Sequence, residues 1–161
     1  MAPNLSVFGN EWDESRDRPG WQWKRLGIAS RLNAEQVGAS LYELQPGQKT
    51  WPYHFHYGEE ELLVVLSGTP ILRDPTGERQ LEAGEVVLFK RGPEGAHLLR
   101  NDSDDPVRLL MVSSLADVDV AVFPDSGKIL AMSAPPGKDL DDRFYVVVPQ
   151  AAAVDYFQGE E

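Results

Sequence analysis

The chain has 161 residues, of which 42% are apolar, and this length fits one domain of ordinary size. It contains no cysteine, which excludes a disulfide framework, a cysteine zinc site, an iron–sulfur cluster and a catalytic thiol. The formal net charge of -11 would repel nucleic-acid phosphates and anionic membranes, so we expect neither partner. The first residues show no basic stretch followed by an apolar run, and we expect a cytoplasmic protein.

Residues 1–36 are predicted to form an N-terminal arm. Trp12, Trp21 and Trp23 stand there among charged residues, and neither the helical nor the strand period is well developed. We expect this arm to pack on the rest of the domain or on a partner subunit. A short helix is predicted around residues 32–36.

Residues 37–114 are predicted to form an antiparallel β-barrel. Short apolar runs alternate here with Gly, Pro and Asp turns, a spacing typical of sandwiches and barrels. The predicted strands are Ala39–Leu44, Glu60–Leu66, Pro70–Arg73, Val86–Phe89, His97–Leu99 and Val107–Val112.

Residues 115–161 are predicted to be a C-terminal extension that covers or completes the barrel. The pattern loosens after Ser114, and one further strand is indicated at Arg143–Val148. A segment of this length is too short to bury a second independent core.

The sequence His54-Phe55-His56 suggests a metal site. Residues two apart in a strand point to the same face, so both imidazoles would converge while Phe55 points away. The alternative is that the histidines are core residues satisfied by hydrogen bonds.

Three acidic residues, Glu59, Glu60 and Glu61, follow directly and lead into the apolar run Leu62–Leu66. A carboxylate at the mouth of a buried strand is costly unless a cation compensates it, and a metal ion would do so. Glu59 has a simpler interpretation as part of a solvated turn.

These residues form a recognisable pattern. Gly47, His54-x-His56, Glu61 and Gly68 resemble the first motif of the cupin superfamily. Gly84, the strand Val86–Phe89, the turn Gly92–Gly95, His97 and Asn101 resemble its second motif. The chain is similar to small bacterial single-barrel cupins of type 2, a subgroup of unassigned function. Lys90 departs from the pattern, because it stands where the second motif has proline.

The resemblance implies an all-β antiparallel cupin or jelly-roll barrel. It also implies that His54, His56, Glu61 and His97 hold one divalent metal ion and leave one or two coordination positions open. The spacing of the motif selects Glu61 over Glu60. Three imidazoles and a carboxylate suit Fe, Mn, Ni, Zn or Cu, and affinity alone does not select among them.

A second set of residues has two interpretations each. Asn101 would either hydrogen-bond a ligating imidazole or fix a turn. Trp51, Tyr53 and Tyr57 would either line a pocket or pack in the core or against a partner. Lys90 and Arg91 would either attract an anionic substrate or remain solvated.

The function predicted from these features is a small-molecule metalloenzyme of the oxygenase, isomerase or decarboxylase type, with oxidoreductase chemistry if the metal is redox-active. The alternative is a metal-dependent module that binds or senses a small molecule without turnover. A storage-type structural barrel fits poorly, because it need not keep four ligands. Cupins often pair, and we expect a homodimer with a small-molecule ligand or substrate.

Overall fold

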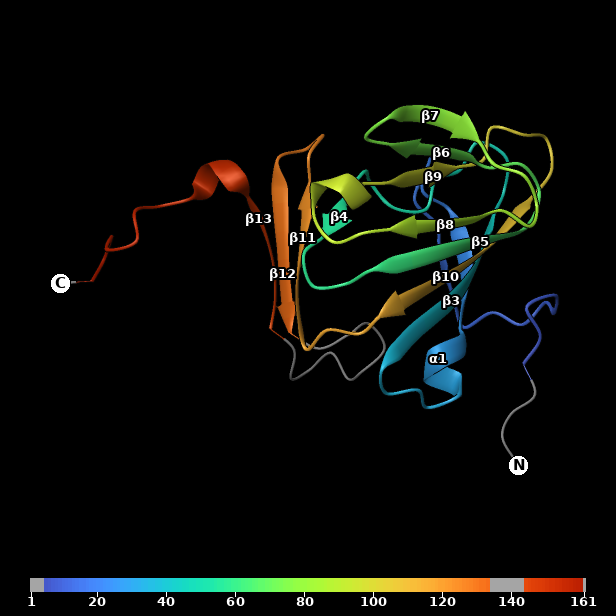
Figure 1. The fold of residues 1–161 in the computed structure, drawn as a ribbon, viewed down its shortest axis with the longest axis horizontal. Coiled ribbons are helices and arrows are strands. Elements are labelled where there is room, and N and C mark those ends of the chain that lie inside the picture. The colour runs from blue at the N-terminus through green and yellow to red at the C-terminus, as the bar shows by residue number, and fades with distance from the viewer. Residues whose placement is uncertain (1–4, 134–143, 161) are drawn as a thin grey trace.

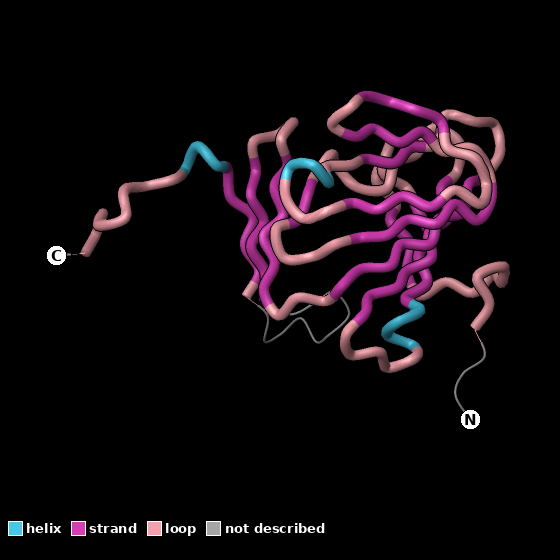
Figure 2. Tube along the Cα trace, in the orientation of Figure 1, coloured by secondary structure: helices cyan, strands magenta, loops and turns pink. Residues whose placement is uncertain are grey.

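The protein is built almost entirely from antiparallel β-strands, as the computed structural model of residues 5–133 and 144–160 shows (Figures 1 and 2). The largest sheet has six strands in the order β1 (Glu14–Arg16), β2 (Trp23–Gly27), β3 (Val37–Leu44), β10 (Val107–Ser114), β5 (Glu61–Ser67) and β8 (Val86–Phe89). A four-stranded sheet has the order β13 (Tyr145–Pro149), β12 (Lys128–Ser133), β11 (Val118–Phe123) and β4 (Phe55–His56). A three-stranded sheet has the order β7 (Gly77–Gln80), β6 (Ile71–Asp74) and β9 (Leu98–Arg100).

In residues 5–133 and 144–160, helical structure is confined to short pieces. The helix α1 covers Ile28–Arg31, and two 3-10 turns cover Pro93–Gly95 and Gln150–Ala152. The helix therefore precedes the predicted segment 32–36. Asn33, which has a left-handed φ of 56°, cannot continue a right-handed helix, so the helix ends before it. Within the described ranges, no helix has the length and apolar character needed to cross a membrane.

The predicted fold class is confirmed, since the strands form antiparallel sheets around a main apolar core, with a second, smaller cluster at Tyr53 and Phe55. The buried residues alternate along β5, at Leu63 and Val65, and along β10, at Val107 and Leu109. The core combines large apolar side chains from both sides of the barrel, including Leu44, Leu63, Val65, Leu72, Leu81, Leu99, Val107 and Leu109. This core fixes the relative positions of the strands that carry the residues of the two motifs.

Two strands of the C-terminal region were not anticipated from the sequence. β11 and β12 pair along six residues each, and the segment Pro124–Gly127 forms the turn between them. β11 also pairs with β4, where Ala121 lies opposite His56. The predicted last strand is present as β13, although Arg143 lies outside the described residues. Because β11 pairs with β4, the β11–β12 hairpin lies directly beside the segment His54–His56 (Figure 1).

The tryptophans of the N-terminal segment contact the barrel of their own chain. Trp23, on β2, is buried in the core and lies edge-on to Tyr42, with ring centroids 5.6 Å apart. The guanidinium of Arg16 lies 4.0 Å from the ring centroid of Trp51 and 4.8 Å from that of Trp23. The β2–β3 pairing extends the six-stranded sheet over this part of the core.

Gly68 is predicted to be essential for the turn after β5. Its φ is 82°, and an added Cβ would lie 2.5 Å from Cγ1 of the fully buried Val107. Gly68→Ala should lower the free energy of unfolding by about 2–4 kcal/mol, through backbone strain and overpacking together. Gly47→Ala is the matched control, because Gly47 has a φ of 76° and open space around it. Equal losses for the two variants in urea denaturation would contradict the packing argument.

Candidate metal centre

Three histidines meet on the inner side of the barrel. His54 and His56 flank Phe55 around β4, and His97 directly precedes β9. A backbone bridge joins His54 to His97, and their ring centroids lie 4.7 Å apart. The ring centroids of His54 and His56 lie 4.9 Å apart. Two segments far apart in sequence therefore bring the three imidazoles together.

Glu61, the first residue of β5, completes the cluster from the facing sheet. Its Oε2 atom lies 3.2 Å from Nε2 of His97 and 3.7 Å from Nε2 of His56. Ligand atoms of His54, His56 and Glu61 all lie within 4.8 Å of one another. Glu60, its neighbour, is exposed. Strand alternation thus places Glu61, and not Glu60, on the face occupied by the histidines.

The hydrogen bonds of the three Nδ1 atoms orient the imidazoles. Nδ1 of His54 donates to the carbonyl of Pro52 at 2.8 Å, and Nδ1 of His97 donates to the carbonyl of Gly95 at 2.9 Å. Nδ1 of His56 donates to Oδ2 of Asp119 at 2.5 Å. Each acceptor requires a proton on Nδ1, so the Nε2 lone pairs of the neutral rings remain free for another partner.

Burial keeps two of these rings neutral. Burial, together with the neighbouring imidazoles of His97 and His56, lowers the pKa of His54 to about 3. Burial also lowers the pKa of His97 to about 4. Neutral imidazoles are the form of histidine that ligates metals.

The carboxylate of Glu61 provides the clearest sign of a missing cation. Its Oε2 atom is buried and accepts no hydrogen bond from the described residues, although the Nε2 atoms of two histidines are close. A buried acceptor without a donor is costly, and a buried carboxylate is more so. A cation bound among these nitrogen and oxygen atoms would satisfy all of them, so the donor set fits a divalent transition metal.

Aromatic rings enclose the imidazoles. Phe89 stacks on His97 with centroids 3.8 Å apart, and Phe123 of β11 stacks on His54 at 5.7 Å. These rings limit the access of water to two of the histidines. The side chains of His56 and Glu61 keep 13% and 18% of their exposure, so solvent reaches the cluster from their side.

Two buried acids beside His56 were not identified as site residues from the sequence. Asp119, on β11, is 2% exposed; burial acts to raise its pKa, but the hydrogen bond to His56, the charge of His56 and two backbone hydrogen bonds together lower it. Glu59 is 5% exposed, and burial raises its pKa to about 7. The prediction that Glu59 lies in a solvated turn is therefore wrong, because the residue is buried. Asp119 interrupts the apolar run Val118–Phe123, which was the available signal in the sequence.

His56 has a different electrostatic environment from the other two histidines. Burial opposes its charge, but the hydrogen bond to Asp119 and the negative charge of Glu61 outweigh burial and raise its pKa. The carboxylates of Asp119 and Glu59 add to the same effect. The acids around His56 therefore make it the most basic imidazole of the three.

The other predicted site residues lie in different surroundings. Asn101 is fully buried and hydrogen-bonds the turn that follows it, through Ser103 and the carbonyl of Asp105, and also the carbonyl of Leu44. Among the described residues, the side chain of Asn101 forms no hydrogen bond with any of the three imidazoles.

The aromatic and basic candidates lie around the cluster. Trp51 packs against the core, Tyr53 is buried beneath the guanidinium of Arg73, and Tyr57 is exposed. Lys90 is exposed near Glu94, with 3.9 Å between their charged groups, and Arg91 is exposed as well. Of these residues, Tyr57 and Lys90 present the most accessible groups.

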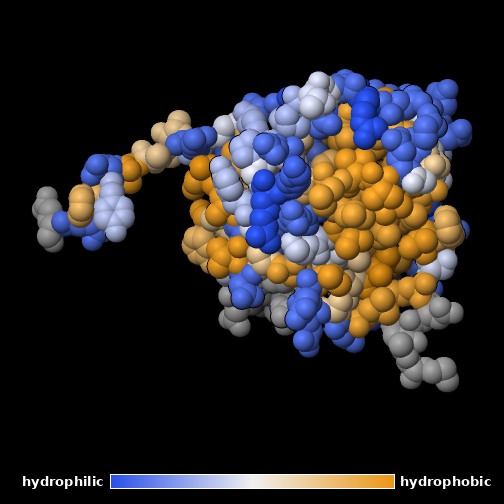
Figure 3. Space-filling view, in the orientation of Figure 1, coloured by the Kyte–Doolittle hydropathy of each residue, from blue (hydrophilic) through white to orange (hydrophobic). Residues whose placement is uncertain are grey.

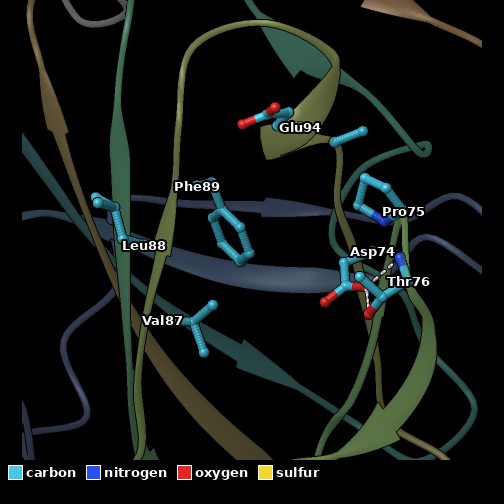
Figure 4. A pocket seen from close by; sticks show the side chains of 8 residues that line it. Asp74, Pro75, Thr76, Val87, Leu88, Phe89 and Glu94 are labelled. Atoms are coloured by element: carbon cyan, nitrogen blue, oxygen red, sulfur yellow. Dashed lines mark hydrogen bonds between the residues drawn. The ribbon is translucent and has the colours of Figure 1, made fainter.

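A cavity of about 300 Å³ lies on the other side of Phe89, between β8 and the β6–β7 turn. Figure 4 shows Val87 and Phe89 directed toward this space, while Leu88 points to the opposite side of the strand. Asp74 and Thr76 hydrogen-bond each other at its far wall. None of the four predicted ligands lines the cavity, so Phe89 separates it from the cluster.

Part of the chain is similar to a known family. Residues 40–113 match the family model of the cupin domain. A search among curated proteins finds none that matches the chain.

Solved structures show the same fold over most of the chain. A cupin-superfamily sugar phosphate isomerase from Silicibacter pomeroyi has a TM-score of 0.77 and 22% identity, covering 94% of this chain and 95% of that protein. A protein from Acidithiobacillus ferrooxidans, provisionally described as a sugar phosphate isomerase, has a TM-score of 0.75 and 24% identity, covering 88% and 86%. The polyketide cyclase RemF from Streptomyces resistomycificus has a TM-score of 0.58 and 22% identity, covering 71% and 80%. At these identities the likeness establishes the fold.

Replacing Glu61 is predicted to change stability and metal binding in opposite directions. Glu61→Gln should raise the unfolding free energy of the metal-free protein by about 1 kcal/mol, because an amide can donate to a free Nε2. It should also weaken zinc binding at least tenfold, because the negative charge is lost. Thermal unfolding and competitive metal titration measure the two effects. The exposed Glu60→Gln is the control, and a similar loss of affinity there would contradict this assignment.

Proposed function

We propose that the protein is a metal-dependent enzyme of the cupin type that acts on a small molecule, since residues 40–113 match the family model of the cupin domain. One divalent transition metal would be held by His54, His56, Glu61 and His97. The observation that carries the proposal is the buried Oε2 atom of Glu61, which faces the Nε2 atoms of His56 and His97 without a proton donor. The metal would supply Lewis-acid or redox chemistry at its open positions.

The residues around the ligands support a role in small-molecule chemistry. Phe89 and Phe123 cover His97 and His54, so the cluster is partly shielded from water. The solvent-accessible side of the cluster lies at His56 and Glu61. A substrate group reaching the metal from that side would displace water from a partly buried site, where electrostatic interactions are stronger than in bulk water.

Among oxygenase, isomerase and decarboxylase chemistry, isomerisation of a sugar phosphate is the first activity to test. The Silicibacter pomeroyi structure named above carries that description, and its likeness covers nearly the whole chain, including the C-terminal sheet. The exposed Lys90 and Arg91 follow β8 and would attract a phosphate group. Metal-dependent binding without turnover is the alternative function.

Turnover is predicted to depend on the histidine cluster. Protein purified without added metal should carry up to one transition metal per chain, and a chelator should remove both metal and activity. The double variant His54→Ala/His56→Ala should lose metal and at least 100-fold in turnover, since two of four ligands are absent. Element analysis and assays with sugar phosphates, oxygen uptake and carbon dioxide release measure this.

The outcomes of these assays separate the alternatives. Full metal content in the double variant would overturn the proposed site. A thermal shift with sugar phosphates, small acids or phenols, without turnover in any assay, would favour the binding module. The identity of the metal would then decide which class of reaction remains to be tested.

We also propose that the protein forms a homodimer through the outer face of the six-stranded sheet. Two apolar rows cross this face, Leu110–Val64–Val86 and Val112–Leu62–Leu88. Val86 and Leu88 are 58% and 54% exposed, and Figure 3 shows the apolar surface over these strands. A contiguous apolar patch on an acidic protein suits an uncharged contact between two copies.

The expected cytoplasmic location stays a prediction.

A charge on this face should prevent the dimer. Leu88→Glu is expected to shift the protein to a monomer at micromolar concentration in light scattering, because burying the new carboxylate is costly. Val118→Glu is the matched control, since Val118 is 62% exposed on β11, in another sheet. A wild-type monomer at 100-fold higher concentration would contradict the proposal, as would an unaffected Leu88→Glu dimer.

A further inference from the structure

We propose that Asp119 is a positioning residue of the metal centre, which holds His56 with its Nε2 atom directed at the metal. The inference rests on the proposed function, since it needs a metal bound at the cluster. It assigns a role in the site to β11, a strand outside residues 40–113, which match the cupin family model. The C-terminal sheet would then contribute to the metal centre itself.

The geometry of Asp119 fits this role. Its Oδ2 atom accepts the hydrogen bond from Nδ1 of His56 at 2.5 Å, and its Oδ1 atom accepts one from the backbone N–H of Gly58 at 2.8 Å. The side chain is 1% exposed, so water does not compete for these bonds. Both oxygens therefore have partners, and the carboxylate has a fixed orientation.

Strand pairing sets this orientation. β11 and β4 are antiparallel, with Ala121 opposite His56, and the N–H of Tyr57 donates to the carbonyl of Val120 at 2.9 Å. Asp119 thus comes from the neighbouring strand at the point where the chain leaves β4. A rotation of the His56 ring would break its bond to a carboxylate that cannot follow it.

His56 differs in this respect from the other two histidines. His54 and His97 donate Nδ1 to neutral backbone carbonyls of residues two positions earlier in the chain. A carboxylate acceptor makes the hydrogen bond stronger and the imidazole a better electron donor. Glu59 adds a second buried carboxyl group, with an oxygen within 4.8 Å of the His56 and Asp119 ligand atoms. Of the three imidazoles that would bind the metal, that of His56 is therefore the one with two buried carboxyl groups beside it.

The test compares Asp119→Asn with Asp125→Asn. Both remove one negative charge from the β11–β12 hairpin, but Asp125 pairs with the exposed guanidinium of Arg73 at 2.6 Å. Zinc affinity by competitive titration should fall 10-fold to 100-fold in Asp119→Asn and less than 2-fold in Asp125→Asn. The visible spectrum of the cobalt-loaded protein should change in Asp119→Asn alone, which a loss of fold stability would not cause.

A second measurement uses the wild type and does not depend on the folding of a variant. In zinc-loaded, ¹⁵N-labelled protein, the His56 ring should show a proton on Nδ1, shifted to low field by the carboxylate. The Nδ1 protons of His54 and His97 should appear at higher field, because their acceptors are neutral.

Each outcome decides the question. A wild type that binds neither zinc nor cobalt overturns the proposed function, and this inference with it. A wild type that binds zinc, together with an Asp119→Asn affinity within 2-fold, overturns the positioning role alone. An equal loss in Asp125→Asn, or a His56 ring without the low-field Nδ1 proton, also overturns it.

Discussion

Three imidazoles and one carboxylate lie close together inside this barrel. The Nδ1 hydrogen bonds of His54, His56 and His97 leave the Nε2 lone pairs free, and Oε2 of Glu61 is buried beside two of them. Burial keeps water from donating to the Oε2 atom of Glu61, although solvent reaches the neighbouring side chain of His56. A bound cation would turn the same arrangement into a stabilising one, so the proposed metal binding would be linked to the stability of the inner face.

The fold imposes this arrangement through long-range pairing. The backbone bridge between His54 and His97 joins two loops more than forty residues apart in sequence, and the facing sheet brings Glu61 from β5. The core of Leu63, Val65, Leu99 and Leu109 holds the two sides at a fixed separation. The free energy that places the donors together therefore comes from apolar burial elsewhere, and the site itself need not be stable alone.

The ligands are not equivalent, because their supports differ. Backbone carbonyls orient two histidines, whereas a carboxylate from the C-terminal sheet orients the third. Phe89 and Phe123 cover one face of His97 and of His54, and His56 remains on the side that solvent reaches. A substrate would approach the metal beside its most electron-rich imidazole. If the proposed metal is bound, the C-terminal sheet would influence its chemistry, although the described residues of this sheet supply no predicted ligand.

The sequence by itself determined the class of fold and the identity of the converging histidine pair, because both depend on local patterns. Apolar runs separated by Gly and Pro turns define strands, and a spacing of two places His54 and His56 on one face. Glu61 and His97 entered through the resemblance of whole motifs. Only the tertiary structure revealed Asp119, the burial of Glu59 and the pairing of β11 with β4. Local periodicity specifies which face a side chain takes, but the choice of neighbouring strand depends on the packing of the whole chain.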